Sequence, residues 1–106
     1  MPRFHDALPA DYIAPGETTI VSVDDFPVAV ANVGGEYFAF QSLCPHQGTT
    51  LGGRPLDEDC FITCSQHSSR YDVRTGRCVR PASDGFNQDL MTFATRVVDG
   101  VVQVEV

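Results

Sequence analysis

The stretch that decides the fold reads Cys44-Pro45-His46-Gln47-Gly48 and resumes at Cys64-Ser65-Gln66-His67-Ser68-Ser69. Each half supplies one thiol and one imidazole, two residues apart in the first half and three apart in the second. Spacings this short let a tight loop turn both side chains toward one point, and thiolates and imidazoles are ligands of transition metals. The sequence therefore predicts one metal centre shared by two loops. Its predicted ligands are Cys44, His46, Cys64 and His67.

The order of these ligands distinguishes between kinds of metal centre. A structural zinc site is the plainer interpretation, but it usually pairs cysteine with cysteine and then histidine with histidine. Here both halves are mixed, and 17 residues separate His46 from Cys64. The pattern C-x-H-x17-C-x2-H resembles the Rieske iron–sulfur family, in which two cysteines hold one iron of a [2Fe–2S] cluster and two histidines hold the other. Further matches to the family are Pro45, Gly48, residues 70–72, residues 75–76 and Pro81.

The resemblance implies an all-β fold, a small antiparallel Rieske-type sandwich or barrel with a cluster-binding tip of two loops. We expect one domain that spans residues 1–106 and one cluster per chain. Cys44 and Cys64 would bind the inner iron, and His46 and His67 the outer iron, which takes the electron. Two ferric ions, two sulfides and two thiolates leave the oxidised centre about neutral. Histidine ligation therefore raises the potential to roughly −150 to +300 mV, against about −400 mV for plant-type ferredoxins.

Residues beside the ligands indicate a branch of the family. The high-potential membrane branch has a further cysteine in each loop, joined as a disulfide, where this chain has Thr49 and Gln66. The chain is in this respect similar to the soluble Rieske ferredoxins. Ser69 and Tyr71 match positions where the high-potential branch uses hydroxyls that hydrogen-bond to a sulfide and a cysteine sulfur. The alternative is that both side chains only pack in the loop. Ser68 departs from the glycine usual in the family.

Composition excludes some classes of function. The net charge is −7, with 14 acidic residues, seven arginines and no lysine, so we expect no binding to nucleic acid. An acidic surface suits docking to a basic patch on a redox partner, or serves solubility alone. The chain has neither an 18-residue apolar run nor an apolar N-terminal segment, so we expect a cytoplasmic protein without membrane contact. Four arginines should make the end after the second loop less acidic: Arg70, Arg74, Arg77 and Arg80.

The sequence outside the two ligand loops predicts short strands. No window shows a sustained 3.6-residue period, which argues against a long helix. Residues 8–17 read as a loop with at most one helical turn. The pair at 24–25 predicts a turn of the chain, and the pairs at 34–35 and 99–100 predict hairpins. Cys60 and Cys78 are expected as buried thiols, a disulfide between them being the minor alternative. The expected strands are residues 3–6, 18–23, 27–33, 36–41, 60–63, 70–73, 77–79, 91–98 and 101–106.

No enzymatic site is predicted. A Rieske oxygenase needs a second domain with an iron held by two histidines and a carboxylate, and only His5, expected at the surface, remains beyond the predicted ligands. The sequence has no Ser-His-Asp, P-loop or dinucleotide signature. We therefore expect a monomeric electron carrier without substrate turnover of its own.

The resemblance implies a soluble Rieske ferredoxin that carries single electrons from a flavin-containing NAD(P)H-dependent reductase to a terminal oxygenase. That oxygenase would be an aromatic ring-hydroxylating dioxygenase or a diiron monooxygenase, in aromatic hydrocarbon catabolism. The Cys-Pro-His-Gln loop occurs in the second class but is too short to decide. An alternative is a non-catalytic Rieske-fold small subunit or regulatory module, as in nitrite reductase. Many such modules lack the ligands, so the four here argue against it, and a structural zinc domain is the third interpretation.

Overall fold

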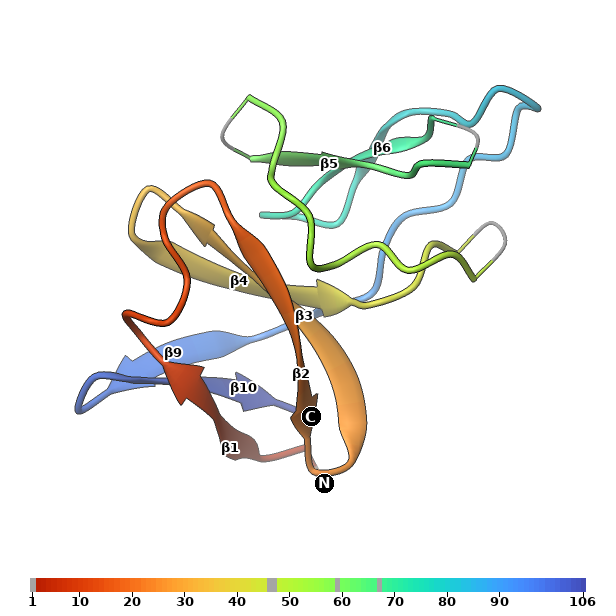
Figure 1. Ribbon diagram of the computed structural model, residues 1–106. Helices are drawn as coiled ribbons and strands as arrows, with labels where there is room; N and C mark the ends of the chain where they lie inside the picture. Colours follow the sequence, from red (N-terminus) through yellow and green to blue (C-terminus); the bar gives the residue numbers. More distant parts are fainter. Residues whose placement is uncertain (1, 46–47, 59, 67) are drawn as a thin grey trace.

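The computed structural model describes residues 2–45, 48–58, 60–66 and 68–106. Within these residues the backbone forms antiparallel strands and turns without a helix, which confirms the all-β prediction (Figure 1). Accordingly, the described part of the chain has no helix long and apolar enough to cross a membrane. The strands are β1 (Phe4–Pro9), β2 (Thr18–Val23), β3 (Phe26–Val33), β4 (Glu36–Gln41), β5 (Phe61–Thr63), β6 (Arg70–Asp72), β7 (Cys78–Arg80), β8 (Thr92–Phe93), β9 (Thr95–Val98) and β10 (Val101–Glu105).

The strands form three sheets, in the orders β1-β10-β9, β2-β3-β4-β8 and β5-β6-β7. The first two sheets make a base that carries both chain termini, and β5 and β6 lie at the opposite end (Figure 1). We call this opposite end the tip. The first predicted ligand loop follows β4, and the second links β5 to β6. Both loops therefore belong to the tip.

Strand β3 separates two hydrophobic cores because side chains alternate between its faces. Its alanines face a tip core, and its buried valines face a base core. Both faces are therefore buried, and one strand joins the base to the half that carries the ligand loops. The tip core contains Ala29, Ala31, Phe40, Cys44, Leu51, Ile62, Cys64, Tyr71, Val73 and Leu90. The base core contains Leu8, Ile13, Val23, Val28, Val30, Ala39, Val102 and Val104.

Close backbone approach fixes the first ligand loop against the base. A Cβ added to Gly52 would lie 2.7 Å from Ile20 Cγ1 and 2.8 Å from Ala29 Cβ. Thr18 strengthens this junction, since its hydroxyl donates to the Arg54 carbonyl at 2.6 Å and accepts the Gly53 N–H at 2.9 Å. The segment after the first loop can therefore lie directly on β2 and β3 only with glycine at position 52.

Several predicted strand bounds are wrong. The single strand expected at residues 91–98 is two strands, because β8 pairs with β4 whereas β9 pairs with β10, and the chain changes sheets at Ala94. The loop expected from residue 8 begins later, since Leu8 is buried in the base core and β1 continues to Pro9 after a bulge. Likewise β5 starts one residue later than expected, β6 ends one residue earlier, and β7 runs from Cys78 to Arg80 rather than over residues 77–79.

Candidate metal centre

The two cysteine loops have the same backbone design. In the first, the Cys44 N–H donates to the Thr49 carbonyl at 2.7 Å, and the Gly48 N–H donates to the Cys44 carbonyl at 2.9 Å. In the second, the Cys64 N–H donates to the Ser69 carbonyl at 2.8 Å, and the Ser68 N–H donates to the Cys64 carbonyl at 3.2 Å. Each loop thus closes with bonds to the fourth and fifth residues after its cysteine.

The fourth residue after each cysteine has a left-handed backbone conformation. Gly48 has φ of +71° and Ser68 has φ of +61°. A left-handed conformation suits glycine and is strained for other residues. The left-handed conformation explains why glycine would be preferred at position 68. This chain keeps that conformation with a serine.

Both cysteines of the motif lie in the tip core with 2% of their surface exposed. The Cys44 Sγ atom is 3.6 Å from Tyr71 Oη and 3.8 Å from Ser69 Oγ. The Tyr71 hydroxyl also donates to Ser69 Oγ at 3.1 Å. A ligating thiolate carries no proton and can only accept. Each hydroxyl has one proton, so while Tyr71 donates to Ser69 it is the Ser69 hydroxyl that is placed to donate toward the Cys44 sulfur, and Tyr71 can donate to this sulfur only in place of Ser69. The two hydroxyls thus lie beside a predicted ligand, and their action on the cluster stays a prediction.

Burial keeps the Tyr71 hydroxyl protonated. The side chains of Tyr71 and Ser69 are fully buried. Burial raises the pKa of Tyr71 far above its ordinary value, and the hydrogen bond between Tyr71 and Ser69 opposes this shift only in part. The phenol is therefore a hydrogen-bond donor at every pH at which the protein would work.

The predicted histidine ligands, His46 and His67, lie outside the described residues. Among those that are described, no three His, Cys, Asp or Glu side chains gather into a metal site, so the ligand set cannot be completed from them. The neighbours Gly48, Gln66 and Ser68 are exposed, in contrast to the two buried cysteines. Two buried thiols with hydroxyl donors at one of them fit a thiolate-ligated metal group, since a buried thiolate needs such partners.

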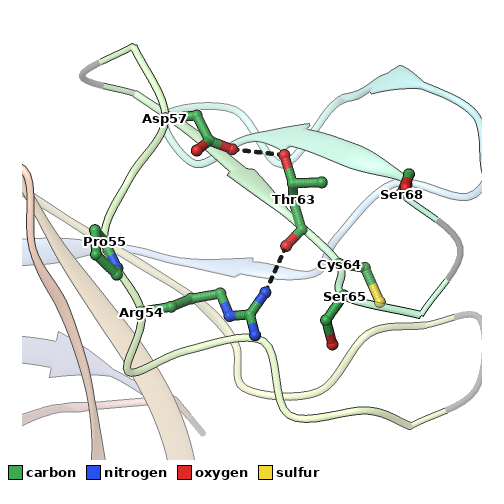
Figure 2. Close-up of a pocket in the computed structure, with 7 residues that line it drawn as sticks. All are labelled: Arg54, Pro55, Asp57, Thr63, Cys64, Ser65 and Ser68. Atoms are coloured by element: carbon green, nitrogen blue, oxygen red, sulfur yellow. Dashed lines mark hydrogen bonds between the residues drawn. The ribbon is translucent and has the colours of Figure 1, made fainter.

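Beside Cys64 lies an open hollow of about 500 Å³ (Figure 2). Arg54 reaches across it and donates from Nη1 to the Thr63 carbonyl at 3.0 Å, while the Thr63 hydroxyl donates to Asp57 Oδ2 at 2.6 Å. Arg54 and Asp57 thus brace the end of β5, one residue before Cys64. Sequence reasoning missed both residues, because neither belongs to a motif. The lining residues are Arg54, Pro55, Asp57, Thr63, Cys64, Ser65 and Ser68.

The other predicted features have mixed outcomes. Cys60 and Cys78 are separate thiols, with Cys60 buried and Cys78 only partly so. Strand β6 lies between them, so their backbones are about 10 Å apart, too far for a disulfide. His5, expected at the surface, has 26% of its side chain exposed, and its Nε2 atom lies 4.0 Å from Asp24 Oδ2. Arg70 and Arg74 are paired with acids, Arg70 with Glu58 at 3.4 Å and Arg74 with Asp72 at 2.9 Å.

The family model of the Rieske [2Fe-2S] domain matches residues 3–94, and the chain belongs to this family. Over 79 residues it is 42% identical to the biphenyl dioxygenase ferredoxin subunit of Pseudomonas sp. (strain KKS102), covering 74% of this chain and 72% of the relative. It is 28% identical over 102 residues to the ferredoxin component of the alkene monooxygenase system of Xanthobacter autotrophicus (strain ATCC BAA-1158 / Py2), covering 96% of this chain and 80% of the relative.

A solved structure resembles the fold closely. A chain in the complex of reduced oxygenase and oxidized ferredoxin of carbazole 1,9a-dioxygenase has a TM-score of 0.81 and 29% identity, covering 93% of this chain and 98% of that one. The cofactor of this chain is accordingly a Rieske-type [2Fe–2S] cluster, as predicted, and the zinc interpretation is not supported.

Proposed function

We propose that this chain is the electron-transferring ferredoxin component of a multicomponent oxygenase. The observation that carries the proposal is the pair of equivalent loops that bury Cys44 and Cys64 at one tip of a Rieske fold. The sequence relatives described above are ferredoxin components, which does not favour the alternative of a regulatory or small-subunit module. We further propose that the chain works as a single, monomeric, cytoplasmic domain and turns over no substrate.

The proposed ligands are Cys44 and Cys64 for the inner iron and His46 and His67 for the outer iron. When bound, the cluster takes up and releases one electron. The chain excludes water from the cysteine side through the tip core, and it supplies hydroxyl donors from Ser69 and Tyr71. The exposed residues beside the histidine positions suit an electron exit toward a docked partner.

The proposed partners are a terminal oxygenase, which receives the electron, and a flavin-containing NAD(P)H-dependent reductase, which supplies it. A dioxygenase partner is supported by the biphenyl dioxygenase relative, and a diiron monooxygenase partner by the alkene monooxygenase relative. The first has the higher identity over a shorter region, so we favour an aromatic ring-hydroxylating dioxygenase.

Two measurements test the proposal. The purified protein should contain about two irons and two sulfides and should give a reduced-state EPR signal with the low average g value of mixed histidine and cysteine ligation. His67→Ala should abolish or strongly alter this signal, whereas Gln66→Ala, its exposed neighbour, should leave it intact. An unchanged spectrum in His67→Ala would remove His67 from the ligand set.

The second measurement reconstitutes electron transfer. A biphenyl-type dioxygenase with a flavin reductase and NADH should form product only when this protein is added, and Cys64→Ser, which lacks a proposed ligand, should not replace it. An alkene monooxygenase assayed in parallel distinguishes the two oxygenase classes. Failure to support either oxygenase, with the cluster fully loaded, would contradict the oxygenase assignment.

A further inference from the structure

Strands β6 and β7 are joined irregularly just beside the second ligand loop. Arg70 pairs with Arg80, and the next residue, Tyr71, pairs with Cys78, so Val79 is an extra residue on β7. This arrangement is a β-bulge, which bends the strand and redirects the side chains next to it. Val79 is 44% exposed, and Arg80 is exposed as well.

The bulge brings Arg80 to the second ligand loop. Its Nε atom donates to the Ser68 carbonyl at 3.0 Å, across 12 residues of sequence. Ser68 follows the proposed ligand His67 directly, and its own N–H closes the loop on the Cys64 carbonyl at 3.2 Å. The Ser68–Ser69 peptide group, one residue beyond the ligand, is therefore held by a charge-assisted hydrogen bond from the end of β7.

Ser68 needs such a contact more than glycine would. Its φ of +61° is strained for a serine, and strained backbone persists only where its surroundings hold it. A Cys78–Arg80 contact fixes the donor in turn, since the Cys78 thiol donates to the Arg80 carbonyl at 3.4 Å. Burial raises the pKa of the Cys78 thiol, which keeps it protonated and able to donate.

We propose that Arg80 is a positioning residue that holds the second ligand loop through the Ser68 carbonyl, and that its positive charge there favours the reduced cluster. The inference rests on the proposed ligand set. The oxidised centre is about neutral and gains one negative charge on reduction, so a nearby cation stabilises the reduced state more than the oxidised state. Because the guanidinium is exposed, solvent and salt reduce this preference without abolishing it.

Three variants of the cluster-loaded protein test the inference. Arg80→Gln should lower the reduction equilibrium constant about threefold to tenfold, which a one-electron couple shows as a fall of about 30 to 59 mV in protein-film voltammetry. Amide hydrogen exchange of the peptide that covers residues 64–69 should also become faster. Arg77→Gln is the matched control, since it removes the same charge from an exposed arginine that directly precedes β7, three residues and about 10 Å of extended chain from Arg80. It should change neither measurement.

Arg80→Lys separates charge from hydrogen bonding and serves if Arg80→Gln does not assemble its cluster. It keeps the cation but lacks Nε, so its potential should lie between those of wild type and Arg80→Gln, with faster exchange than wild type. Equal shifts in Arg80→Gln and Arg77→Gln, or wild-type values in both Arg80 variants, would overturn the inference. These readouts need no oxygenase, so they stand whether or not electron transfer to a particular oxygenase is observed.

Discussion

At the scale of single residues, the two hydroxyls at Cys44 distinguish this tip from a bare thiolate site. Tyr71 donates to Ser69, and both hydroxyl oxygens lie within 3.8 Å of the Cys44 sulfur, so they form one short network. Hydrogen bonds to a ligand sulfur strengthen when the cluster gains negative charge. The sequence predicted the identity of these residues from the motif, but only the fold shows that both point at Cys44.

Removing either hydroxyl should lower the reduction potential. A hydrogen bond to a charged group contributes about 1.5–3 kcal/mol, and we take about half of this as the difference between redox states. Tyr71→Phe should then lower the potential by roughly 30–70 mV, and Ser69→Ala by a similar amount, since about 59 mV corresponds to a factor of ten. The double variant should shift less than the sum, because the hydroxyls share one network.

Protein-film voltammetry of the loaded proteins measures these shifts. Tyr37→Phe is the matched control, because its hydroxyl donates to the Ala10 carbonyl in the base, away from the cysteines. That variant should keep the wild-type potential. Shifts within about 10 mV of zero in both Tyr71→Phe and Ser69→Ala would show that the hydroxyls do not act on the cluster.

At the scale of elements, what could be predicted depends on whether the signal was local. β2 and β4 have the predicted bounds, because the β-branched run of β2, the aromatic-rich run of β4 and the turn residues beside each are local signals. The change of sheet at Ala94 was missed, since partners far away in sequence decide it. For the same reason the brace of Arg54 on Thr63 has no sequence signal, and the cysteines were found only because their loops are local motifs.

The turn between β6 and β7 should tolerate no side chain at Gly76. Its φ is +80°, and an added Cβ would lie 2.5 Å from the Leu90 carbonyl oxygen, a backbone atom. Left-handed strain and overpacking together should make Gly76→Ala less stable by about 2–4 kcal/mol. Gly35→Ala is the control, because φ there is +99° with nothing within 4 Å of the added Cβ, so only strain remains. Urea unfolding of the loaded proteins compares them, and equal losses would argue against the close approach.

Asp72, in the same turn, should make the free energy of unfolding depend on pH. Its carboxylate accepts hydrogen bonds from Arg74 N, Nε and Nη2 at 2.9–3.0 Å, and chiefly the side-chain bonds lower the pKa of Asp72. Because the pKa of Asp72 is lower in the folded protein than in the unfolded chain, its carboxylate stabilises the fold at any pH above the unfolded-state pKa of about 3.9. This contribution is lost as the pH falls through the folded-state pKa.

Asp72→Asn keeps the shape of the side chain but not its charge. It should be less stable than wild type by about 1 kcal/mol at pH 6, and the difference should narrow as the pH falls below about 4. Urea unfolding at a series of pH values gives this difference directly. A difference that stays constant down to pH 3 would mean that the carboxylate charge contributes nothing to stability.

At the scale of the whole molecule, charge is distributed unevenly between base and tip. The chain carries −7 overall, and four arginines follow the second ligand loop. Two of them are locally compensated, since Arg70 pairs with Glu58 and also lies 4.4 Å from the Phe61 ring centre, and Arg74 pairs with Asp72. The tip is therefore less basic than the count of arginines suggests, and the net acidic field dominates at long range.

This field should steer the encounter with an oxygenase that presents a basic surface. Attraction between opposite charges raises the association rate, and salt screens it, with a screening length of about 30 Å at 0.01 M and about 8 Å at 0.15 M ionic strength. The second-order rate of electron transfer from the reduced ferredoxin should accordingly fall about tenfold over this range, measured by stopped-flow spectroscopy under excess oxygenase. The reduction potential of the ferredoxin, recorded at each salt concentration, is the control, because it shows whether the driving force changes as well. With a constant driving force, a falling rate reports the encounter itself. A rate that is flat across the series would exclude steering by the acidic surface and leave solubility as the role of the net charge.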